Sequence, residues 1–465
     1  MDLNLGDESS LRGRFARVRS MIDAGHLHEA EQELAVLQAR WPEHAVSWAF
    51  RGVLCDRQGR IDEALEAMAY AARLRPDDGE ILANLARLYA RGSRWEEALQ
   101  YCRRSLIIDE NQPHVWLEAA RCCLVLRQWR EAEACARNSL HLQGRQAQAF
   151  VFLGQALAAQ QRCVEAQGVF EAALAEDEQN AEAWDGAAWL ELRRGDLKSA
   201  IVQYRRALEL RLGQPLRVDV RTPPVQGFDD TGLIEALLWQ TLARLAQAGV
   251  HAFATSGTLL GLTRERRLLP FDKDLDIGLP FAEMDSARAC LLVCGWQEEP
   301  SGADFCNPMS FRHQDSGVVL DLFGFLADPV AGTVVSGFWL RGQPWSVQRV
   351  TEYPAPLRLH QVRRSGGRVW ALIDPEIWLA ALYGAEWRVP DPDFDSVVAA
   401  RNLRGFSLLT ECYGLMRIGK YLHERRYAKG LATTIHCLRH LPEDALLQRA
   451  EAVLMGAVEA NSASA

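Results

Sequence analysis

SGTLLGLTR, at residues 256–264, and LPFDKDLDI, at residues 269–277, decide the fold of the second half of the chain. The first follows a short apolar run and places the small Ser256-Gly257-Thr258 turn before apolar residues with helical spacing, which predicts a strand, a turn and a helix. In the second, acidic and apolar residues alternate, as is typical of a half-buried strand.

The flanking segments continue this order. Asp230 precedes an apolar-periodic run over 233–248, which predicts a capped helix. A helix rich in Ala and Leu is expected at roughly 281–294, and the apolar residues 318–323 predict another strand. Helices and strands therefore alternate, and the sequence predicts an α/β or α+β sheet domain.

Acidic side chains in these strands are candidates for one metal site. Asp274 and Asp276 lie two residues apart, so in a strand both carboxylates point to the same face, where they repel each other unless a cation neutralises them. Mg²⁺ or Mn²⁺, which prefer oxygen ligands, are the natural occupants. Asp321, between two leucines of the later strand, is costly to bury unpaired and joins the site if the strands are neighbours. Asp272, just before the pair, adds a ligand or holds the loop.

Each of these patterns also has an ordinary structural explanation. An Asp-x-Asp pair alone is weak evidence, because surface strands and turns often contain one, and Asp321 alone fits an edge charge. The Ser256-Gly257-Thr258 turn strengthens the case, since backbone N–H groups at a helix N-terminus bind phosphate well; its alternative is a simple helix cap. Turn and carboxylates together predict an anion-plus-metal site for phosphoryl or nucleotidyl transfer.

The first half of the chain is an internal repeat. Shifting the sequence by 34 residues aligns a column of large apolar residues, Trp48, Leu82, Trp116, Phe150 and Trp184. A second column is alanine throughout: Ala30, Ala64, Ala98, Ala132, Ala166 and Ala200. Large residues fill the space between helices and small ones let the backbones approach, so each repeat is a helical hairpin that stacks on its neighbours.

This pattern resembles the tetratricopeptide repeat, over residues 11–213 and about six repeats. The resemblance implies an all-α superhelix with a concave surface that binds a protein partner. A spacer or dimerisation element is the alternative.

The prolines of residues 214–229 predict a linker between the two halves. Residues 401–458 have a helical pattern again and predict a short helical C-terminal region, interpreted as one degenerate repeat. The expected architecture is therefore multidomain.

Composition excludes several functions. The formal net charge of −9 gives no electrostatic case for nucleic-acid binding. No apolar run is long enough to span a membrane, and the first residues lack the pattern of a secretory signal, so we expect a cytoplasmic protein. The eleven cysteines have no paired Cys-x-x-Cys spacing and are expected to be free thiols.

Residues 256–264 and 269–277, taken together, resemble the signature of the LicD/fukutin-related family, a branch of the nucleotidyltransferase-fold superfamily. The resemblance extends over residues 230–400. It includes Leu320-Asp321-Leu322-Phe323 and a closing motif made of Tyr353-Pro354, Pro356-Leu357, Asp374-Pro375 and Tyr383-Gly384-x-x-Trp387-x-x-Pro390. Two residues depart from the usual motif: Lys273 replaces the middle acid of a triple, and Phe271 replaces Trp. Lys273 leaves the alternating acids intact and is expected to neutralise a phosphate or Asp272.

The resemblance implies a transferase that moves a phosphorylated alcohol, phosphocholine or an alditol phosphate, from a CDP-activated donor to a glycan or glycoconjugate hydroxyl. By the same resemblance, Mg²⁺ or Mn²⁺ held by Asp274, Asp276 and Asp321 would bridge the donor pyrophosphate. Membership of this family also implies a role in cell-surface glycan modification. Asp321 or Asp272 would accept the proton of the acceptor.

The residues expected to bind a substrate phosphate are Ser256, Gly257, Thr258 and Arg264, together with Lys273 because of its positive charge. For Arg264, a surface ion pair with a nearby acid is about equally plausible. Two other functions stay open: an inactive or regulatory repeat scaffold for protein–protein interaction, and a nucleotidyltransferase that modifies a protein or small molecule.

Overall fold

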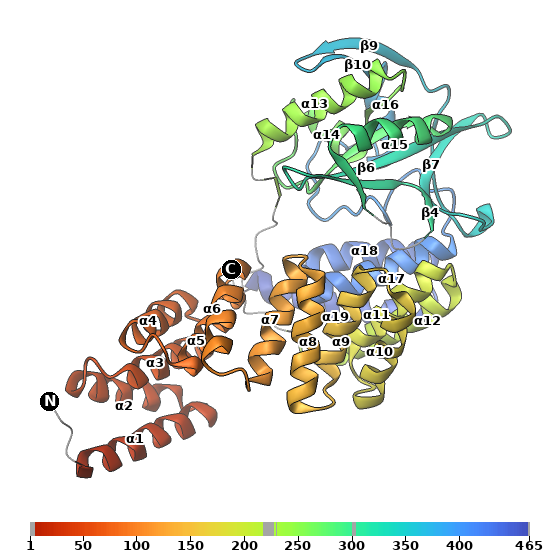
Figure 1. Ribbon diagram of the computed structural model, residues 1–465. Helices are drawn as coiled ribbons and strands as arrows, with labels where there is room; N and C mark the ends of the chain where they lie inside the picture. The colour runs from red at the N-terminus through yellow and green to blue at the C-terminus, as the bar shows by residue number, and fades with distance from the viewer. Residues whose placement is uncertain (1–4, 217–226, 229, 300–303, 464–465) are drawn as a thin grey trace. The chain divides into compact units, whose positions relative to one another are not determined.

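The computed structural model describes residues 5–216, 227–228, 230–299 and 304–463. The chain divides into two compact units, Met1–Gly186 and Ala187–Ala465. The first unit contains most of the repeat helices, and the second contains the last repeat helix, the sheet domain and the C-terminal helices (Figure 1).

Among the described residues, twelve helices precede the sheet domain, and they confirm the predicted all-α repeat array. They are α1 (Leu5–Asp23), α2 (Leu27–Arg40), α3 (Ala45–Arg57), α4 (Ile61–Leu74), α5 (Gly79–Arg91), α6 (Trp95–Ile108), α7 (Pro113–Val125), α8 (Trp129–Gln143), α9 (Ala147–Ala159), α10 (Cys163–Glu176), α11 (Ala181–Arg194) and α12 (Leu197–Leu212). Successive helices pack as hairpins, for example α3 on α4 and α5 on α6. Every alanine of the all-alanine column, from Ala30 to Ala200, is fully buried, as its role in close helix contacts requires.

Small and large side chains compensate each other where these helices cross. A Cβ atom added at Gly52 would lie 2.9 Å from Met68 Cε, and one added at Gly154 would lie 2.7 Å from the ring of Phe170. A Cβ atom at Gly186 would lie only 2.3 Å from the same ring. Two glycines therefore make room for one fully buried phenylalanine.

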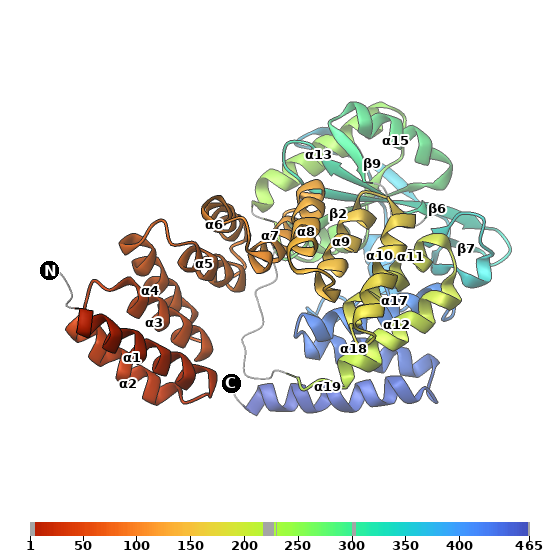
Figure 2. The same ribbon diagram turned by 60° about the horizontal axis from the view of Figure 1, so that its bottom comes forward.

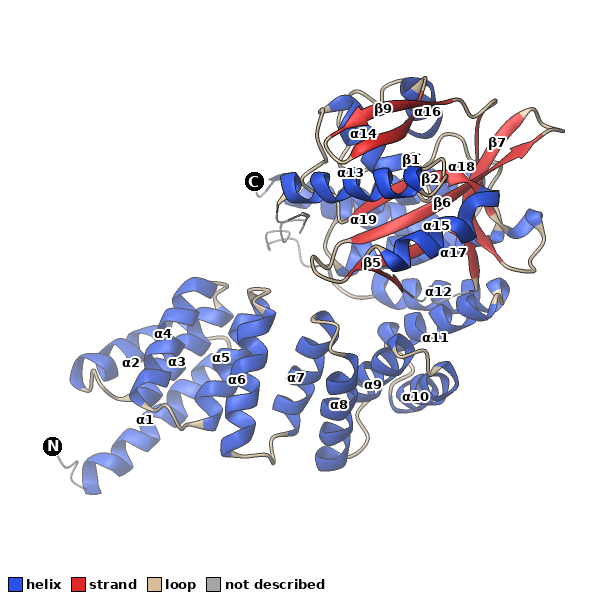
Figure 3. Cartoon of the chain, turned by 45° about the horizontal axis from the view of Figure 1, so that its top comes forward, coloured by secondary structure: helices blue, strands red, loops and turns tan. Residues whose placement is uncertain are grey.

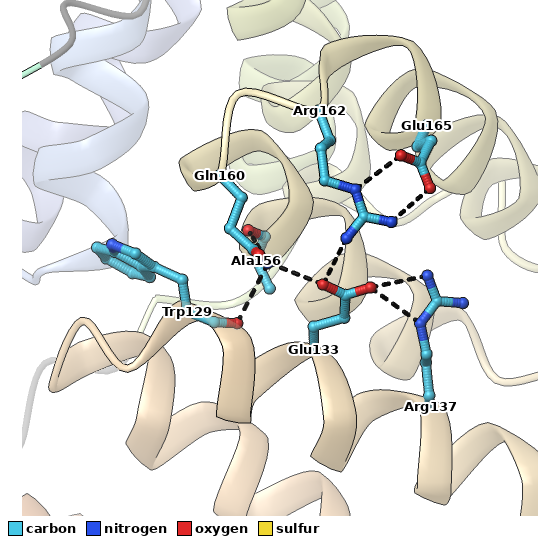
Figure 4. A network of polar contacts seen from close by, with 7 residues as sticks. All are labelled: Trp129, Glu133, Arg137, Ala156, Gln160, Arg162 and Glu165. Atoms are coloured by element: carbon cyan, nitrogen blue, oxygen red, sulfur yellow. Dashed lines mark hydrogen bonds and ion pairs between the residues drawn. The ribbon is translucent and has the colours of Figure 1, made fainter.

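A polar network joins α8, α9 and α10 around Glu133 (Figure 4). Glu133 Oε2 accepts hydrogen bonds from Gln160 Nε2 at 2.8 Å and from Arg162 Nη1 at 2.7 Å. The same arrangement occurs three repeat lengths earlier, among Glu31, Gln58 and Arg60. Because partly exposed ion pairs contribute at most about 1 kcal/mol each, the networks matter mainly as evidence that the repeats share one hydrogen-bonding register.

The sheet domain begins after the linker. Its elements are α13 (Thr231–Gln247), β1 (Phe253–Ala254), α14 (Ser256–Arg264), β2 (Asp274–Pro280), η1 (Phe281–Glu283), α15 (Met284–Val293), β3 (Trp296–Glu299), β4 (Phe305–Asn307), β5 (Met309–His313), β6 (Val319–Asp328), β7 (Thr333–Leu340), η2 (Trp345–Val347), β8 (Arg349–Pro354), β9 (Leu359–Arg364), β10 (Gly367–Leu372) and α16 (Pro375–Tyr383). The main sheet has the order β1-β2-β6-β5-β3, and β7 pairs with β4, β6 and β8 (Figure 3). Strands β2 and β6 run parallel, whereas the other pairs of described strands are antiparallel, so the domain is α+β.

The two faces of the sheet have different environments. The apolar residues of β2 and β6, including Leu275 and Leu320, point to a core that α13 and α15 complete. A second core contains Phe253, Phe325 and Trp378 and lies beneath α14 and α16. Since neighbouring residues of a strand alternate between faces, the acidic residues of β2 and β6 point away from the first core.

The helical C-terminal region continues the repeat pattern. It consists of α17 (Leu408–His423), α18 (Tyr427–His440) and α19 (Ala445–Ala463), which pack with α12 around one apolar core (Figure 2). A hydrogen bond from a side chain to the carbonyl six residues earlier recurs in the array, from Trp48 to Pro42 and from Trp116 to Glu110, and it reappears from Gln448 to Pro442. The chain therefore returns to a tetratricopeptide-like hairpin after the sheet domain.

Several details differ from the sequence prediction. The strand expected before the Ser256 turn is only two residues long, because β1 pairs with β2 solely at Phe253 and Ala254. Strands β3, β4 and β5 lie between the helix predicted at 281–294 and the strand predicted at 318–323, and they were not predicted because each is at most five residues long. Most of the linker predicted at 214–229 lies outside the described residues. Helix α19 extends to Ala463, beyond the predicted end at 458.

The Phe170 packing gives a stability prediction. Gly186→Ala should lower the free energy of unfolding by about 1–2 kcal/mol, because overpacking a buried ring costs more than the helix propensity gained. Gly168→Ala is the matched control: no heavy atom lies within 4 Å of the added Cβ, so it should stabilise by about 1 kcal/mol. Urea unfolding followed by circular dichroism measures both, and equal stabilisation by the two substitutions would contradict the packing.

Candidate active site

The parallel pairing of β2 with β6 brings the acidic residues together. In this register Asp276 lies directly opposite Asp321, and Asp274 lies opposite Val319. Asp274 and Asp276 share one face of β2, as predicted, and the paired strand places Asp321 beside them. Strand β5, on the other side of β6, places Ser310 opposite Asp321, where Ser310 Oγ donates a 2.5 Å hydrogen bond to Asp321 Oδ1.

The turn at the start of α14 holds Asp276 on both sides. The backbone N–H of Gly257 donates to Asp276 Oδ2 at 2.8 Å, and Thr258 Oγ1 accepts from the backbone N–H of Asp276 at 2.8 Å. A Cβ atom added at Gly257 would lie 3.2 Å from Asp276 Oδ2 and 3.4 Å from Asp272 Oδ2. Glycine is therefore the residue that lets this helix start approach two carboxylates.

The four carboxylates lie in a strongly negative environment. Burial, followed by the charge of Asp274, raises the pKa of Asp272 to about 7 and that of Asp321 to about 7. Burial raises the pKa of Asp276 well above its ordinary value, and the charges of the other three carboxylates add to the shift. The charge of Asp274 thus makes ionisation of Asp272, Asp276 and Asp321 less favourable, and a bound cation relieves this kind of repulsion.

The donor set fits a hard divalent cation. It consists of carboxylate oxygens, and Asp272 Oδ2 is buried without a hydrogen-bond partner. Within the described part of the chain, no three His, Cys, Asp or Glu side chains are gathered closely enough to hold an ion as they stand. Side-chain rotation would therefore have to bring the ligands together.

The basic residues predicted to bind phosphate lie at two places near the carboxylates. Arg264, at the end of α14, is only 10% exposed and pairs with Glu265 at 2.9 Å. The surface ion pair that was the alternative to phosphate binding by Arg264 is thus present. The charge of Arg264 also lowers the pKa of Asp272 and so opposes the effect of burial. Lys273 is exposed, and its charge acts on Asp274. Binding of a phosphate by these residues and by the Ser256 turn stays a prediction.

Three further residues near the site were not predicted from the sequence. Ser310 orients Asp321. Tyr383 of α16 is partly buried near the carboxylates: burial and then the charges of Asp276 and Asp272 raise its pKa well above the ordinary value. Arg417 of α17 acts on Asp274: burial raises the pKa of that carboxyl, and Arg417 opposes the rise most strongly. No local motif marks Ser310 or Arg417, whereas Tyr383 belongs to the closing motif but was not predicted to lie beside the carboxylates.

Comparison with protein families identifies the domain that carries this geometry. The model of the LicD/FKTN/FKRP nucleotidyltransferase domain matches residues 249–357, which include the turn and all four carboxylates. The chain carries a LicD domain. The tetratricopeptide-repeat model matches residues 15–79, 56–113 and 159–215, so repeats precede the LicD domain.

Solved structures similar to the chain are tetratricopeptide-repeat proteins. They include YrrB, described as having an unusual peptide-binding site (16% identity, 39% of this chain and 93% of that chain, TM-score 0.34). Others are pilF of Pseudomonas aeruginosa (18%, 45% and 95%, TM-score 0.40) and a repeat protein from Parabacteroides merdae (20%, 44% and 85%, TM-score 0.38). None of the curated proteins matches the chain.

The LicD domain indicates a transferase of phosphorus-containing groups, and the repeats indicate binding of a protein partner. Trp378 of α16 and Trp387 of the closing motif are packing residues, since both are 5% exposed and lie in the core beneath α14 and α16. The described helices include none with the length and apolar character needed to cross a membrane.

Thr258 gives a direct test of how the LicD domain positions Asp276. Thr258→Val keeps the shape of the side chain but leaves the Asp276 N–H, next to a buried core, without its acceptor. We expect a loss of about 1–3 kcal/mol in the free energy of unfolding. Thr258→Ser retains the hydroxyl and should lose much less. Chemical denaturation of the two variants measures the difference; similar losses would show that the missing methyl or general packing, and not the hydrogen bond, sets the stability.

Proposed function

We propose that this chain transfers a phosphorylated alcohol, phosphocholine or an alditol phosphate, from a CDP-activated donor to a hydroxyl of a glycan or glycoconjugate, in a reaction that requires Mg²⁺ or Mn²⁺. The observation that carries the proposal is the register of β2 and β6 within the LicD domain, which places Asp276 opposite Asp321 on the face that carries Asp274. A site of this kind suits the transfer of a charged phosphorus group.

Asp274, Asp276 and Asp321 are the residues that would hold the cation, whose charge would stabilise the diphosphate of the donor and the departing CMP. The chain's own groups prepare these ligands. The Gly257 N–H and the Ser310 hydroxyl each orient one carboxylate, so that only part of the ligand set has to rotate when the cation binds. Arg264 and the Ser256 turn are proposed to bind a phosphate of the donor.

In the proposed transfer, the acceptor oxygen forms a bond to the phosphorus that carries the alcohol, and the bond from that phosphorus to the bridging oxygen breaks. CMP leaves with the bridging oxygen. Asp272 is the carboxylate we assign to accept the proton of the acceptor hydroxyl, because its Oδ2 is buried and has no hydrogen-bond partner. Asp321 is less suitable for this role, since Ser310 already donates to it.

The same geometry argues against an inactive scaffold. Keeping four carboxylates on one partly buried face costs free energy of folding, as their raised pKa values indicate, and a scaffold gains nothing from that cost. Binding of a protein partner is assigned to the repeats. One hollow on the array, lined by residues that include Pro76, Asp77, Ile108 and Asp109, offers a mixed apolar and acidic surface for such a partner.

The transfer itself can be measured as release of CMP from CDP-choline, CDP-glycerol or CDP-ribitol in the presence of Mg²⁺ and candidate glycan acceptors. We expect Asp276→Asn to lower the rate at least about 100-fold, because it removes a charged ligand without changing the size of the side chain. Asp285→Asn, on the exposed start of α15, is the matched control and should retain the rate.

Two results would overturn this assignment. Wild-type rates in Asp276→Asn would show that the carboxylate face is not the site of transfer. Labelling of a protein or small molecule by UTP or ATP, without CMP release from any CDP donor, would instead favour a nucleotidyltransferase.

A further inference from the structure

A group of basic side chains on α17 and α18 faces the part of the LicD domain that carries Asp274. We call Arg417, Lys420, Arg426 and Lys429 the α17–α18 basic cluster. Arg417 and Lys420 lie on α17, Arg426 is the N-cap of α18, and Lys429 lies on α18. The charges of Arg417, Arg426 and Lys273, which is in the loop before β2, all act on Lys420. The cluster is outside the residues that the LicD family model matches.

A continuous chain of aromatic contacts connects α17 to the carboxylate face. Phe323 follows Asp321 by two residues on β6 and so lies on the same face of the strand. Its ring is 6.2 Å from that of Phe338, and Phe338 is 5.2 Å from the ring of Tyr413 on α17. Arg417 comes one helical turn after Tyr413 and therefore lies on the same side of α17.

Electrostatic effects agree with this placement. Burial raises the pKa of Asp274, and Arg417 and Lys273 are the charges that oppose the rise. Burial lowers the pKa of Lys420 and of Lys429. Neighbouring cations add to both shifts, although Glu424 and Asp395 oppose them. The cluster is thus a region where positive charge accumulates next to one member of the carboxylate group.

The protein neutralises this cluster only loosely. Arg417 lies 3.8 Å from Asp395, while Lys420 and Arg426 each lie 3.8 Å from Glu424. Charge-assisted hydrogen bonds are usually about 2.7–2.9 Å long, so none of these ion pairs forms a hydrogen bond. By contrast, Arg205 on α12 makes two bonds to Asp444, at 2.7 and 2.9 Å.

Two side chains of the cluster could turn a donor towards a ligand. Arg417 Nε is buried and makes no hydrogen bond, because Asp395, the acid it faces, is 3.8 Å away. Asp395, the nearest acid, is already occupied: it accepts a 2.5 Å hydrogen bond from Tyr421 and a 2.9 Å bond from the backbone of Val397. Lys420 is 49% exposed and can move towards a bound molecule.

We propose that the α17–α18 basic cluster, together with Lys273, binds the diphosphate of the activated donor on the Asp274 side of the carboxylate face. This inference rests on the proposed function. A guanidinium and flexible ammonium groups around one anion suit a diphosphate, which has several oxygens to share. A donor fits better than an anionic acceptor, because the diphosphate is the group that must lie against the cation ligands, and Asp274 is one of them.

The consequence is that the C-terminal helices are part of the transferase site. The repeat hairpin that follows the LicD domain supplies Arg417 and Lys420, and α12 of the N-terminal array packs directly against it. The catalytic centre of this chain is therefore built from the LicD domain and from a tetratricopeptide-like helix together.

Calorimetric titration of the full chain with pyrophosphate and with CDP, in buffer containing EDTA, measures the contribution of the cluster without any bound metal. We expect Arg417→Met and Lys420→Met each to weaken the binding of both probes about tenfold, and increasing salt to weaken binding to the wild type. Arg439→Met, on the exposed end of α18, should bind like the wild type. Thermal melting of each variant checks the fold, and Lys420, being exposed, can be replaced without disturbing a core.

Binding of both probes to Lys420→Met and to folded Arg417→Met with wild-type affinity would overturn the proposal, as would wild-type chain that binds neither probe. Loss of pyrophosphate binding with unchanged CDP binding would also overturn it, because the cluster would then serve another anion, such as an acidic acceptor. Cluster-dependent binding of both probes without CMP release from any CDP donor would support the cluster and refute the transferase assignment, so the two failures are distinguishable.

Discussion

Mutual repulsion among four carboxylates is the constraint on which the site depends. The parallel register of β2 and β6 fixes Asp276 opposite Asp321. If the pairing of the two strands shifted by one residue, the acidic side chains of one strand would point into the apolar core beneath α13 and α15. The protein holds this arrangement with directed hydrogen bonds from Gly257 and Ser310. An unfavourable concentration of negative charge is thereby kept ready for a cation and a charged substrate.

The repeats and the LicD domain form a more integrated protein than their order along the chain suggests. Helices α17–α19 resume the repeat pattern after the sheet domain and share a core with α12. The same helix that packs on the array carries Arg417 towards Asp274.

Much of this organisation could be predicted from local patterns. The alanine column identifies the helical hairpins because small residues are needed at every crossing, and alternation in LDLDI places Asp274 and Asp276 on one face. The pairing of Asp276 with Asp321 depends on a parallel contact between distant strands, which no local pattern specifies. Ser310 lies in a strand of only five residues whose pairing with β6 no local pattern specifies, and Arg417 lies in a helix whose sequence shows only the repeat. The sequence also favoured phosphate as the partner of the Gly257 N–H, whereas in the structure this group donates to Asp276.

Binding of Mn²⁺, followed by the electron paramagnetic resonance signal of the free ion, tests the central claim most directly because it requires neither donor nor acceptor. We expect the wild type to bind one Mn²⁺ ion per chain. Asp321→Asn, whose side chain keeps its size and position on β6, should bind Mn²⁺ with much lower affinity. Equal binding to the wild type and to this variant would contradict the claim that the paired strands form the metal site.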